Sequence, residues 1–187
     1  MSKTIEKLKS YVPYNEQEEV DKQFFIDCER KEQILTRDNT LCHLVSSAVI
    51  LNKTRDKMLA IYHNIYKTWA WVGGHADGDD DMLYVAIKEA KEETSLEEFK
   101  VLLNEPIAID SISVDSHYRR GKFIPAHTHL NYAYVFEADE NAVVHIKEDE
   151  NSNIAWLTLD ELIEKSCERK MYPIYRKIFE KIKKLGL

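Results

Sequence analysis

The stretch that decides the fold runs from Gly73 to Leu96 and reads GGHADGDDDMLYVAIKEAKEETSL. It opens with two glycines, which allow the backbone to approach a ligand closely where a side chain would block it. An acidic loop follows, and aspartates suit the positive end of a helix dipole. Four apolar residues then recur at i, i+3, i+4 and i+7, namely Leu83, Ala86, Ile87 and Ala90. This spacing predicts an amphipathic helix that packs against a sheet.

Three glutamates, Glu89, Glu92 and Glu93, fall on another face of this predicted helix. Their i, i+3 and i+4 spacing brings the carboxylates within one turn, where like charges repel by roughly a few tenths of a kcal/mol per pair. A divalent cation would compensate the repulsion, and clustered oxygen ligands suit Mg²⁺ or Mn²⁺, which in turn hold substrate phosphates. The alternative is a solvated acidic face on which Lys88 and Lys91 offset the charge.

The same stretch resembles the box of the Nudix hydrolases, G-x5-E-x7-R-E-U-x-E-E-x-G-U, in which U is a bulky aliphatic residue. Gly74 to Leu96 fill this box without insertion or deletion, with the three glutamates in register. Four positions depart from it and hold Asp80, Lys88, Ala90 and Ser95. Lysine lacks the bidentate guanidinium fork of the usual arginine. Serine at the helix exit must take the left-handed conformation that glycine favours, or end the helix differently.

The resemblance implies an α/β fold, an α/β/α sandwich with a mixed β-sheet. It also implies hydrolysis of a diphosphate bond in a nucleoside diphosphate linked to another moiety, with Mg²⁺ (or Mn²⁺) as the cofactor. The implied metal ligands are Glu89, Glu92, Glu93 and the carbonyl of Gly73. The metal would polarise phosphoryl oxygens and lower the pKa of the attacking water.

The sequence leaves open which carboxylate accepts the proton of that water. Glu92 and Glu93 are candidates within the box. Glu148 and Glu150 are candidates by resemblance, because Nudix enzymes often use a glutamate from a loop outside the box. The alternative for their segment, KEDEN at 147–151, is an ordinary acidic turn.

The candidate substrate-binding residues lie in the box and in a later turn. Gly74 and Lys88 belong to the box, and Arg119 and Arg120 belong to the turn RRGKF. These cations could hold a distal phosphate or carboxylate of the substrate. The alternative is a solvated loop, because arginine and lysine clusters lie mostly on the surface.

Two pairs of ring residues have a functional and a structural interpretation. Trp69 and Trp71 precede the diglycine and could stack on a nucleobase, but we expect them to pack. His127 and His129 would share one face of a strand, and a structural role is the preferred prediction. No carboxylate or cysteine stands at an evident metal-ligand spacing from them.

Length and composition indicate one domain with one substantial core, in a chain of 187 residues with 44% hydrophobic and 32% charged residues. The net charge of -7 argues against non-specific binding to nucleic acid or to an anionic membrane. Cys28, Cys42 and Cys167 are widely spaced and odd in number, which predicts free thiols in a reducing compartment. No apolar run suits a signal peptide or a membrane span, so we expect a cytoplasmic protein.

Residues 1–36 are predicted to form an N-terminal helical extension, and residues 37–187 a Nudix hydrolase domain. Val20, Phe24, Ile26 and Leu35 are the apolar residues expected to pack the extension on the domain, with a lid or a homodimer contact as the alternative.

Within the domain, LCHLVSSAVILN and the segment starting MLAIYHNIY predict a hairpin of buried strands before the box. THLNYAYVFEAD predicts a strand with one packed face, formed by Leu130, Tyr132, Tyr134 and Phe136. NIAWLTLDEL predicts a strand followed by a helix capped by Thr158 or Asp160, and a final helix starts near Tyr172.

Two other functions compete with hydrolysis. Some Nudix domains are ligand sensors that have lost box residues, and Asp80, Lys88 and Ser95 keep that interpretation open. Some relatives isomerise an isoprenoid diphosphate through a cysteine and a glutamate, for which Cys42 or Cys167 could be proposed. Hydrolysis is preferred because the three box glutamates are present.

Overall fold

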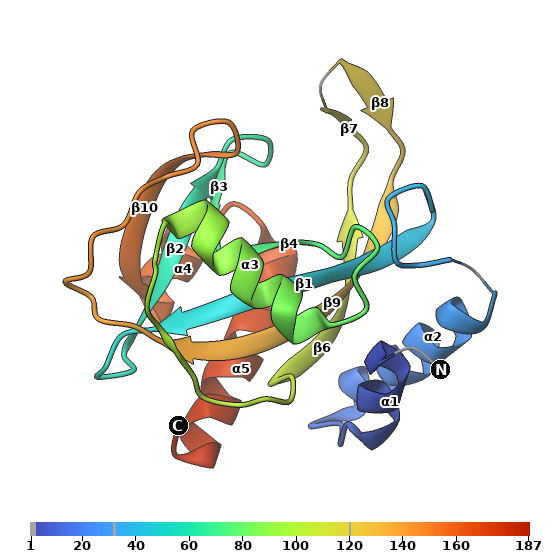
Figure 1. The fold of residues 1–187 in the computed structure, drawn as a ribbon, viewed down its shortest axis with the longest axis horizontal. Helices are drawn as coiled ribbons and strands as arrows, with labels where there is room; N and C mark the ends of the chain where they lie inside the picture. Colours follow the sequence, from blue (N-terminus) through green and yellow to red (C-terminus); the bar gives the residue numbers. More distant parts are fainter. Residues whose placement is uncertain (1–2, 32, 120) are drawn as a thin grey trace.

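The computed structural model describes residues 3–31, 33–119 and 121–187 (Figure 1). The helices are α1 (Lys3–Ser10), α2 (Glu16–Lys31), α3 (Met82–Thr94), α4 (Leu159–Lys165) and α5 (Tyr172–Leu185), with a 3₁₀ turn at Arg169–Met171. The strands are β1 (Cys42–Leu51), β2 (Lys57–His63), β3 (Thr68–Ala70), β4 (Val72–His75), β5 (Lys100–Val101), β6 (Ala108–Val114), β7 (His117–Arg119), β8 (Lys122–Ile124), β9 (His127–Glu137) and β10 (Asn151–Thr158).

Eight of the described strands form one mixed sheet in the order β10-β2-β1-β9-β5, with β3 on β2, β4 on β1 and β6 on β9. The predicted hairpin is the antiparallel pair β1 and β2. The strands β1 and β9 run parallel, and their register pairs His43 with His129. Both strands therefore begin at the same edge of the sheet, where the hairpin of β7 and β8 projects (Figure 1).

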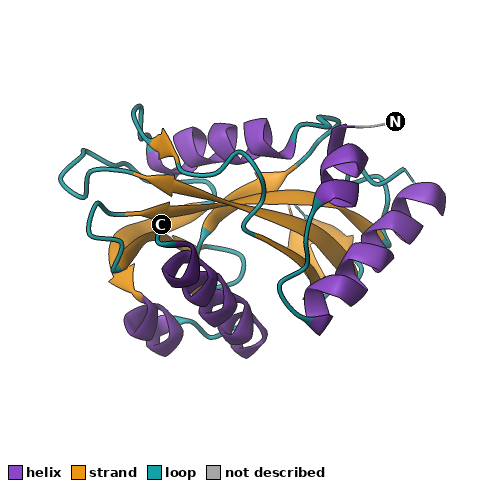
Figure 2. Cartoon of the chain, turned by 90° about the horizontal axis from the view of Figure 1, so that it is seen from below, coloured by secondary structure: helices purple, strands orange, loops and turns teal. Residues whose placement is uncertain are grey.

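The sheet lies between helices, as the resemblance implies. Figure 2 shows α3 over one face of the sheet and α4 and α5 under the other. The predicted packed face of β9, with Leu130 and Tyr132, meets the cluster on the α3 side, and Ala133 and Val135 point to α5. Burial of these two apolar layers is what holds the helices to the sheet. None of the described helices is long and apolar enough to cross a membrane.

The N-terminal helices pack on the same core as α3. Leu8 and Phe25 join that cluster, and the ring of Phe25 lies 5.6 Å from the ring of Tyr132. The packing prediction is wrong for two of its residues, because Val20 and Phe24 are 63% and 41% exposed. The helix turns the neighbouring Phe25 inward instead.

A buried ionic network joins α2 to α5. Glu18 is fully buried and accepts from Lys177 at 3.0 Å and from Lys181 at 3.1 Å. The Tyr11 hydroxyl donates to it at 2.5 Å, and Lys177 also lies 2.6 Å from Asp110. Burial alone would raise the pKa of Glu18, but the Tyr11 hydrogen bond and the lysines hold that pKa below its usual value.

Capping residues explain where the helices α3 and α4 begin and where α3 ends. Asp81 caps the N-terminus of α3. Ser95 ends it in the left-handed conformation, with φ of 57°, so serine adopts the backbone that glycine would favour. Of the two candidates for α4, Thr158 is the cap, in a reciprocal capping box with Glu161.

Candidate active site

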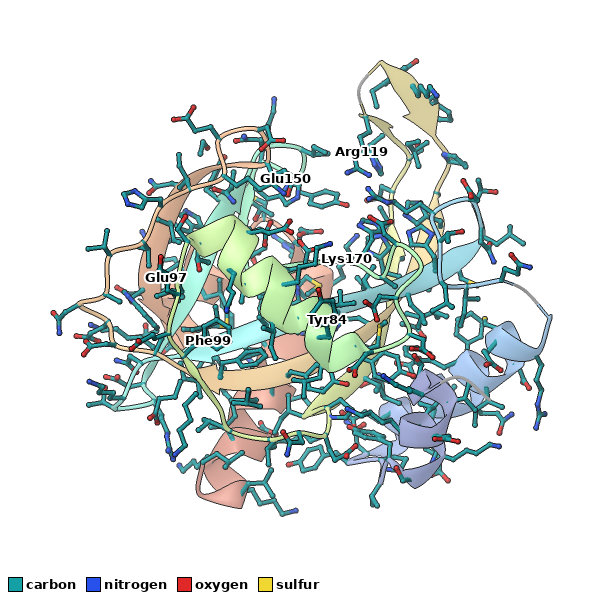
Figure 3. All side chains as sticks on the ribbon, in the orientation of Figure 1. Tyr84, Glu97, Phe99, Arg119, Glu150 and Lys170 are labelled. Atoms are coloured by element: carbon teal, nitrogen blue, oxygen red, sulfur yellow. The ribbon has the colours of Figure 1, made fainter. Side chains whose placement is uncertain are left out.

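A cavity of about 670 Å³ opens between α3, the loop before β10 and the hairpin of β7 and β8. Box residues line one side of it: Gly73, Gly74, His75, Asp77, Lys88, Glu89, Glu92 and Glu93. Arg119 on β7 and Glu150 before β10 lie on opposite sides of the opening (Figure 3).

The diglycine lets strand β4 approach both β1 and α3. A Cβ on Gly73 would lie 2.7 Å from the carbonyl oxygen of Ser46, and a Cβ on Gly74 would lie 2.2 Å from the carboxyl carbon of Glu89. Neither glycine has a positive φ, so the close approach, and not an unusual backbone, is what requires glycine here.

Glu93 is the least solvated carboxylate of the site. It is 2% exposed, and its Oε2 accepts a hydrogen bond of 2.9 Å from the Gly73 N–H. Within the described residues no lysine or arginine lies within ion-pair distance of it. Burial raises the pKa of Glu93 to about 8. Burial and the neighbouring Glu92 also raise the pKa of Glu89, and the Lys88 Nζ, 3.9 Å away, does not offset this rise.

The helix face that carries these groups corrects the sequence interpretation. Glu89 and Glu93 do not lie on a separate exposed face, because they are buried together with Met82, Val85 and Ala86. These residues have the same 3.6-residue period as the predicted stripe, shifted by one position, and the glutamates continue the buried face toward the cavity. Leu83 and Ile87, predicted at its centre, are only partly buried.

Two lysines partly neutralise Glu89, Glu92 and Glu150. The Nζ of Lys88 lies 3.9 Å from an oxygen of Glu89 and 3.9 Å from one of Glu92. The Nζ of Lys147 lies 3.6 Å from Glu92 and 3.2 Å from Glu150, which links α3 to the loop before β10. Long, partly exposed pairs of this kind contribute less than about 1 kcal/mol each. A cluster of carboxylate oxygens with so little compensation fits a hard divalent cation such as Mg²⁺.

The remaining predicted residues divide between the cavity and its surroundings. Glu150 and Arg119 line the cavity, and Arg120 lies outside the described residues. Glu148 is exposed and does not contribute to the described lining. The Asp80 carboxylate accepts from the backbone N–H of Lys3 at 3.2 Å, so it anchors α1, and it is not among the described lining of the cavity.

The predicted packing of the tryptophans is correct. Trp71 meets Tyr175 edge to face with ring centroids 5.3 Å apart, and Trp69 meets Tyr62 at 5.8 Å. Both pack on the α5 side of the sheet.

The aromatic side chains of the cavity were not among the predicted substrate-binding residues. Tyr66 follows β2, and Tyr118 and Phe123 form an edge-to-face pair across the hairpin at 5.5 Å. Tyr118 and Phe123 are 72% and 59% exposed. Large exposed rings beside a cavity are unusual for a surface whose only task is solvation.

Four histidines gather at the edge where β1 and β9 begin. His43 lies with ring centroids 5.1, 4.8 and 5.1 Å from those of His75, His127 and His129. Burial lowers the pKa of His75 to about 3 and that of His129 to about 2, so these rings are neutral at pH 7. Sequence reasoning noted only the pair on β9, because the link to His43 depends on the parallel register.

Comparison with known proteins agrees with this geometry. A family model described as NUDIX domain matches residues 43–181. A NUDIX-family hydrolase from Clostridium perfringens superposes with a TM-score of 0.56 at 21% identity, covering 76% of this chain and 97% of that one. A Caenorhabditis elegans Ap4A hydrolase gives 0.55 at 19%, covering 76% and 99%. The Escherichia coli dihydroneopterin triphosphate pyrophosphohydrolase gives 0.53 at 13%, covering 72% and 92%.

A search of curated proteins finds no match to the sequence. The family model spans most of the chain, and the solved structures share its fold, including the mixed sheet between helices. The chain therefore belongs to the NUDIX family, a family of pyrophosphohydrolases.

Proposed function

We propose that this chain hydrolyses a diphosphate bond in a nucleoside diphosphate linked to another moiety, with Mg²⁺ or Mn²⁺ as cofactor. The observation that carries the proposal is the pair Glu89 and Glu93. Both are buried beside the cavity with raised pKa values, and no arginine or lysine of the described residues pairs with Glu93. A divalent cation at these oxygens would remove the electrostatic cost of burying them.

In this proposal each carboxylate has a role that follows from its exposure. Glu89 and Glu93, with the Gly73 carbonyl and Glu92, would hold the cation. When bound, the cation supplies Lewis-acid polarisation of the phosphoryl oxygens and a lower pKa for water. Glu92 and Glu150 are the more exposed carboxylates that line the cavity, so either could accept the proton of the attacking water.

The rest of the cavity supports an anionic substrate with a ring. Arg37, Lys88 and Arg119 line it and could bind phosphate oxygens. Tyr66, whose ring lies 6.2 Å from that of His117 on β7, could stack on a base together with the exposed rings of the hairpin. The similar structures named above include hydrolases of Ap4A and of dihydroneopterin triphosphate, so both compounds belong among the substrates to test.

The test is release of phosphate or nucleotide from a panel of substrates, with Mg²⁺, with Mn²⁺ and with EDTA. The panel holds nucleoside triphosphates, Ap4A, ADP-ribose, nucleotide sugars, NADH and dihydroneopterin triphosphate. We expect turnover of one class that EDTA abolishes. Glu93→Gln should lower that turnover by orders of magnitude, whereas Glu148→Gln, outside the cavity lining, serves as the matched control.

Two outcomes would contradict the proposal. Near-normal turnover by Glu93→Gln in a folded protein would remove this carboxylate from the mechanism. Metal-dependent binding without turnover of every compound would favour the ligand-sensing alternative. The isomerase alternative has no support in the cavity, since Cys42 is buried in the core on the α3 side, Cys167 is exposed, and neither is among the described lining residues.

A further inference from the structure

The histidine group at the edge of the sheet has donors of a different chemistry from the carboxylates of α3. One ring nitrogen from each of His43, His75 and His129 lies within 4.8 Å of the other two. The three residues come from β1, β4 and β9, so the sheet fixes their backbones, and all three line the cavity. Imidazole nitrogens suit Zn²⁺ and similar transition metals, whereas Mg²⁺ prefers oxygen.

The hydrogen bonds of His43 leave one of its nitrogens available as a ligand. Its Nδ1 lies 2.9 Å from the carbonyl oxygen of Asn39, which can only accept, so Nδ1 carries the hydrogen. The Nε2 atom then has a lone pair, and it is buried without a hydrogen-bond partner among the described residues. His43 itself is only 4% exposed. A buried acceptor without a donor is unfavourable, and a metal ion is one way to satisfy it.

A second chain of hydrogen bonds orients His129. The Nδ1 of His127 lies 2.8 Å from the carbonyl oxygen of Pro125, so it donates, and its Nε2 must accept. That Nε2 lies 3.2 Å from the Nε2 of His129, which is therefore the donor. The Nδ1 of His129 keeps its lone pair. Metal-binding histidines typically donate their other N–H to such an outer acceptor, and here His127 provides it.

We propose that His43, His75 and His129 bind a zinc-type divalent cation through three imidazole nitrogens, at a site separate from the carboxylates of α3. Tetrahedral Zn–N bonds of about 2.0–2.1 Å put ligand nitrogens about 3.4 Å apart. Side-chain rotations that move the ring nitrogens by about 1 Å would therefore close the site. Three protein ligands leave a fourth position. It opens on the cavity, where water or an anionic oxygen of a substrate completes the coordination.

An anion site made of charged imidazoles is the competing interpretation, and the surroundings argue against it. The charge of Arg37 is already engaged, because its Nε and Nη2 both donate to the carboxylate of Asp77. The hydrogen bonds described above leave lone pairs on the Nε2 of His43 and the Nδ1 of His129, and lone pairs repel phosphate oxygens and attract a cation.

Co²⁺ provides a direct test, because its visible d–d bands report tetrahedral nitrogen ligation. Untagged protein is stripped of metal and titrated with Co²⁺ in the presence of excess Mg²⁺. The variant Glu89→Gln/Glu93→Gln, which lacks the carboxylate site, should still bind one equivalent with tetrahedral bands. His75→Gln and His129→Gln should weaken that binding by more than about a hundredfold, beyond the roughly 10–100-fold that the loss of an outer-shell partner causes. His145→Gln, an exposed histidine outside the cavity, is the matched control.

Two results would overturn the site. One is absence of Co²⁺ uptake by the double glutamine variant, and the other is unchanged affinity in folded His75→Gln and His129→Gln. A second measurement avoids substitutions altogether. X-ray absorption of the unaltered protein loaded with one equivalent of Zn²⁺ should contain imidazole scattering, and a shell made only of oxygen would contradict the proposal.

Discussion

Replacing Gly74 by alanine should disturb the cation site without destabilising the fold. The new Cβ would lie 2.2 Å from the carboxyl carbon of Glu89, and ordinary contact begins at 3.4 Å, so the carboxylate must move by about 1.2 Å (3.4 − 2.2). A misplacement of about 1 Å in a reactive site can lower activity by about a hundredfold, or about 2.7 kcal/mol in the barrier. The group that moves is the end of a flexible side chain, and Gly74 has no positive φ, so the fold should tolerate the change.

The assay compares three quantities in wild type and Gly74→Ala: the Mg²⁺ affinity by calorimetry, the turnover of the identified substrate, and the free energy of unfolding in EDTA. We expect weaker Mg²⁺ binding and about a hundredfold lower turnover, with the free energy of unfolding within about 1 kcal/mol of wild type. Gly73→Ala is the contrasting variant. Its Cβ would meet the backbone of Ser46 and Ser47 at 2.7–2.9 Å, so it should lose about 1–3 kcal/mol of stability.

A double-mutant cycle tests the cause. In a Glu89→Ala background no carboxylate is left to displace, so adding Gly74→Ala should change Mg²⁺ affinity little further. Wild-type Mg²⁺ binding and turnover by folded Gly74→Ala would refute displacement of the Glu89 carboxylate. Simple addition of the effects of the two substitutions would refute it as well.

Three further predictions concern other parts of the molecule. Ser95→Gly should raise the free energy of unfolding by about 1 kcal/mol, because the exposed Ser95 has a φ of 57°; denaturant titration measures this, and no gain would mean that the serine is unstrained. Glu18→Gln should lower that free energy by about 3 kcal/mol at neutral pH, because it leaves the buried Lys181 without its carboxylate partner and the buried Lys177 with Asp110 alone. Since the pKa of Glu18 is lowered in the folded protein, the loss of unfolding free energy in Glu18→Gln should be complete above pH 4.5 and should shrink as the pH falls through the folded-state pKa. A loss that is independent of pH would contradict the ionic explanation. Arg119→Gln should raise KM about tenfold or more with little change in kcat. The control, Arg176→Gln on the exposed side of α5, should change neither constant. An unchanged KM in Arg119→Gln would exclude phosphate binding by this arginine.

The elements with a strong local pattern could be predicted from the sequence. The apolar run LCHLVSSAVILN contains β1, all of whose residues are buried. The alternation in THLNYAYVFEAD corresponds to the packed face of β9. The helix predicted from the box forms as Met82–Thr94, although Glu89 and Glu93 are on its buried face. Of the two helix ends that the sequence allowed at Ser95, the left-handed one is found. In each case short-range spacing and backbone sterics decide the outcome, and the sequence contains both.

What could not be predicted depends on contacts between distant segments. A helical stripe shifted by one residue fits the period nearly as well, and only the packing of α3 against β1 and β4 decides that Glu89 and Glu93 are buried and Leu83 is not. The histidine group likewise requires the register of two parallel strands, which brings His43 beside His129. For α2 the sequence offers Phe24 and Phe25 in succession, and the helix can turn only one of them into the core.

The buried network between α2 and α5 has a consequence for synthesis on the ribosome. Glu18 and Lys181 are 163 residues apart, so at about 5–20 residues per second roughly ten to thirty seconds separate the two in translation. During that interval the carboxylate of Glu18 is better solvated by water than by an incomplete core, which opposes early docking of α2. The helix α2, which emerges long before α5, should therefore be fixed in place only after α5 is made. Until then the face of Phe25 is available to chaperones, and pulse-labelled hydrogen exchange on stalled chains would follow its closure.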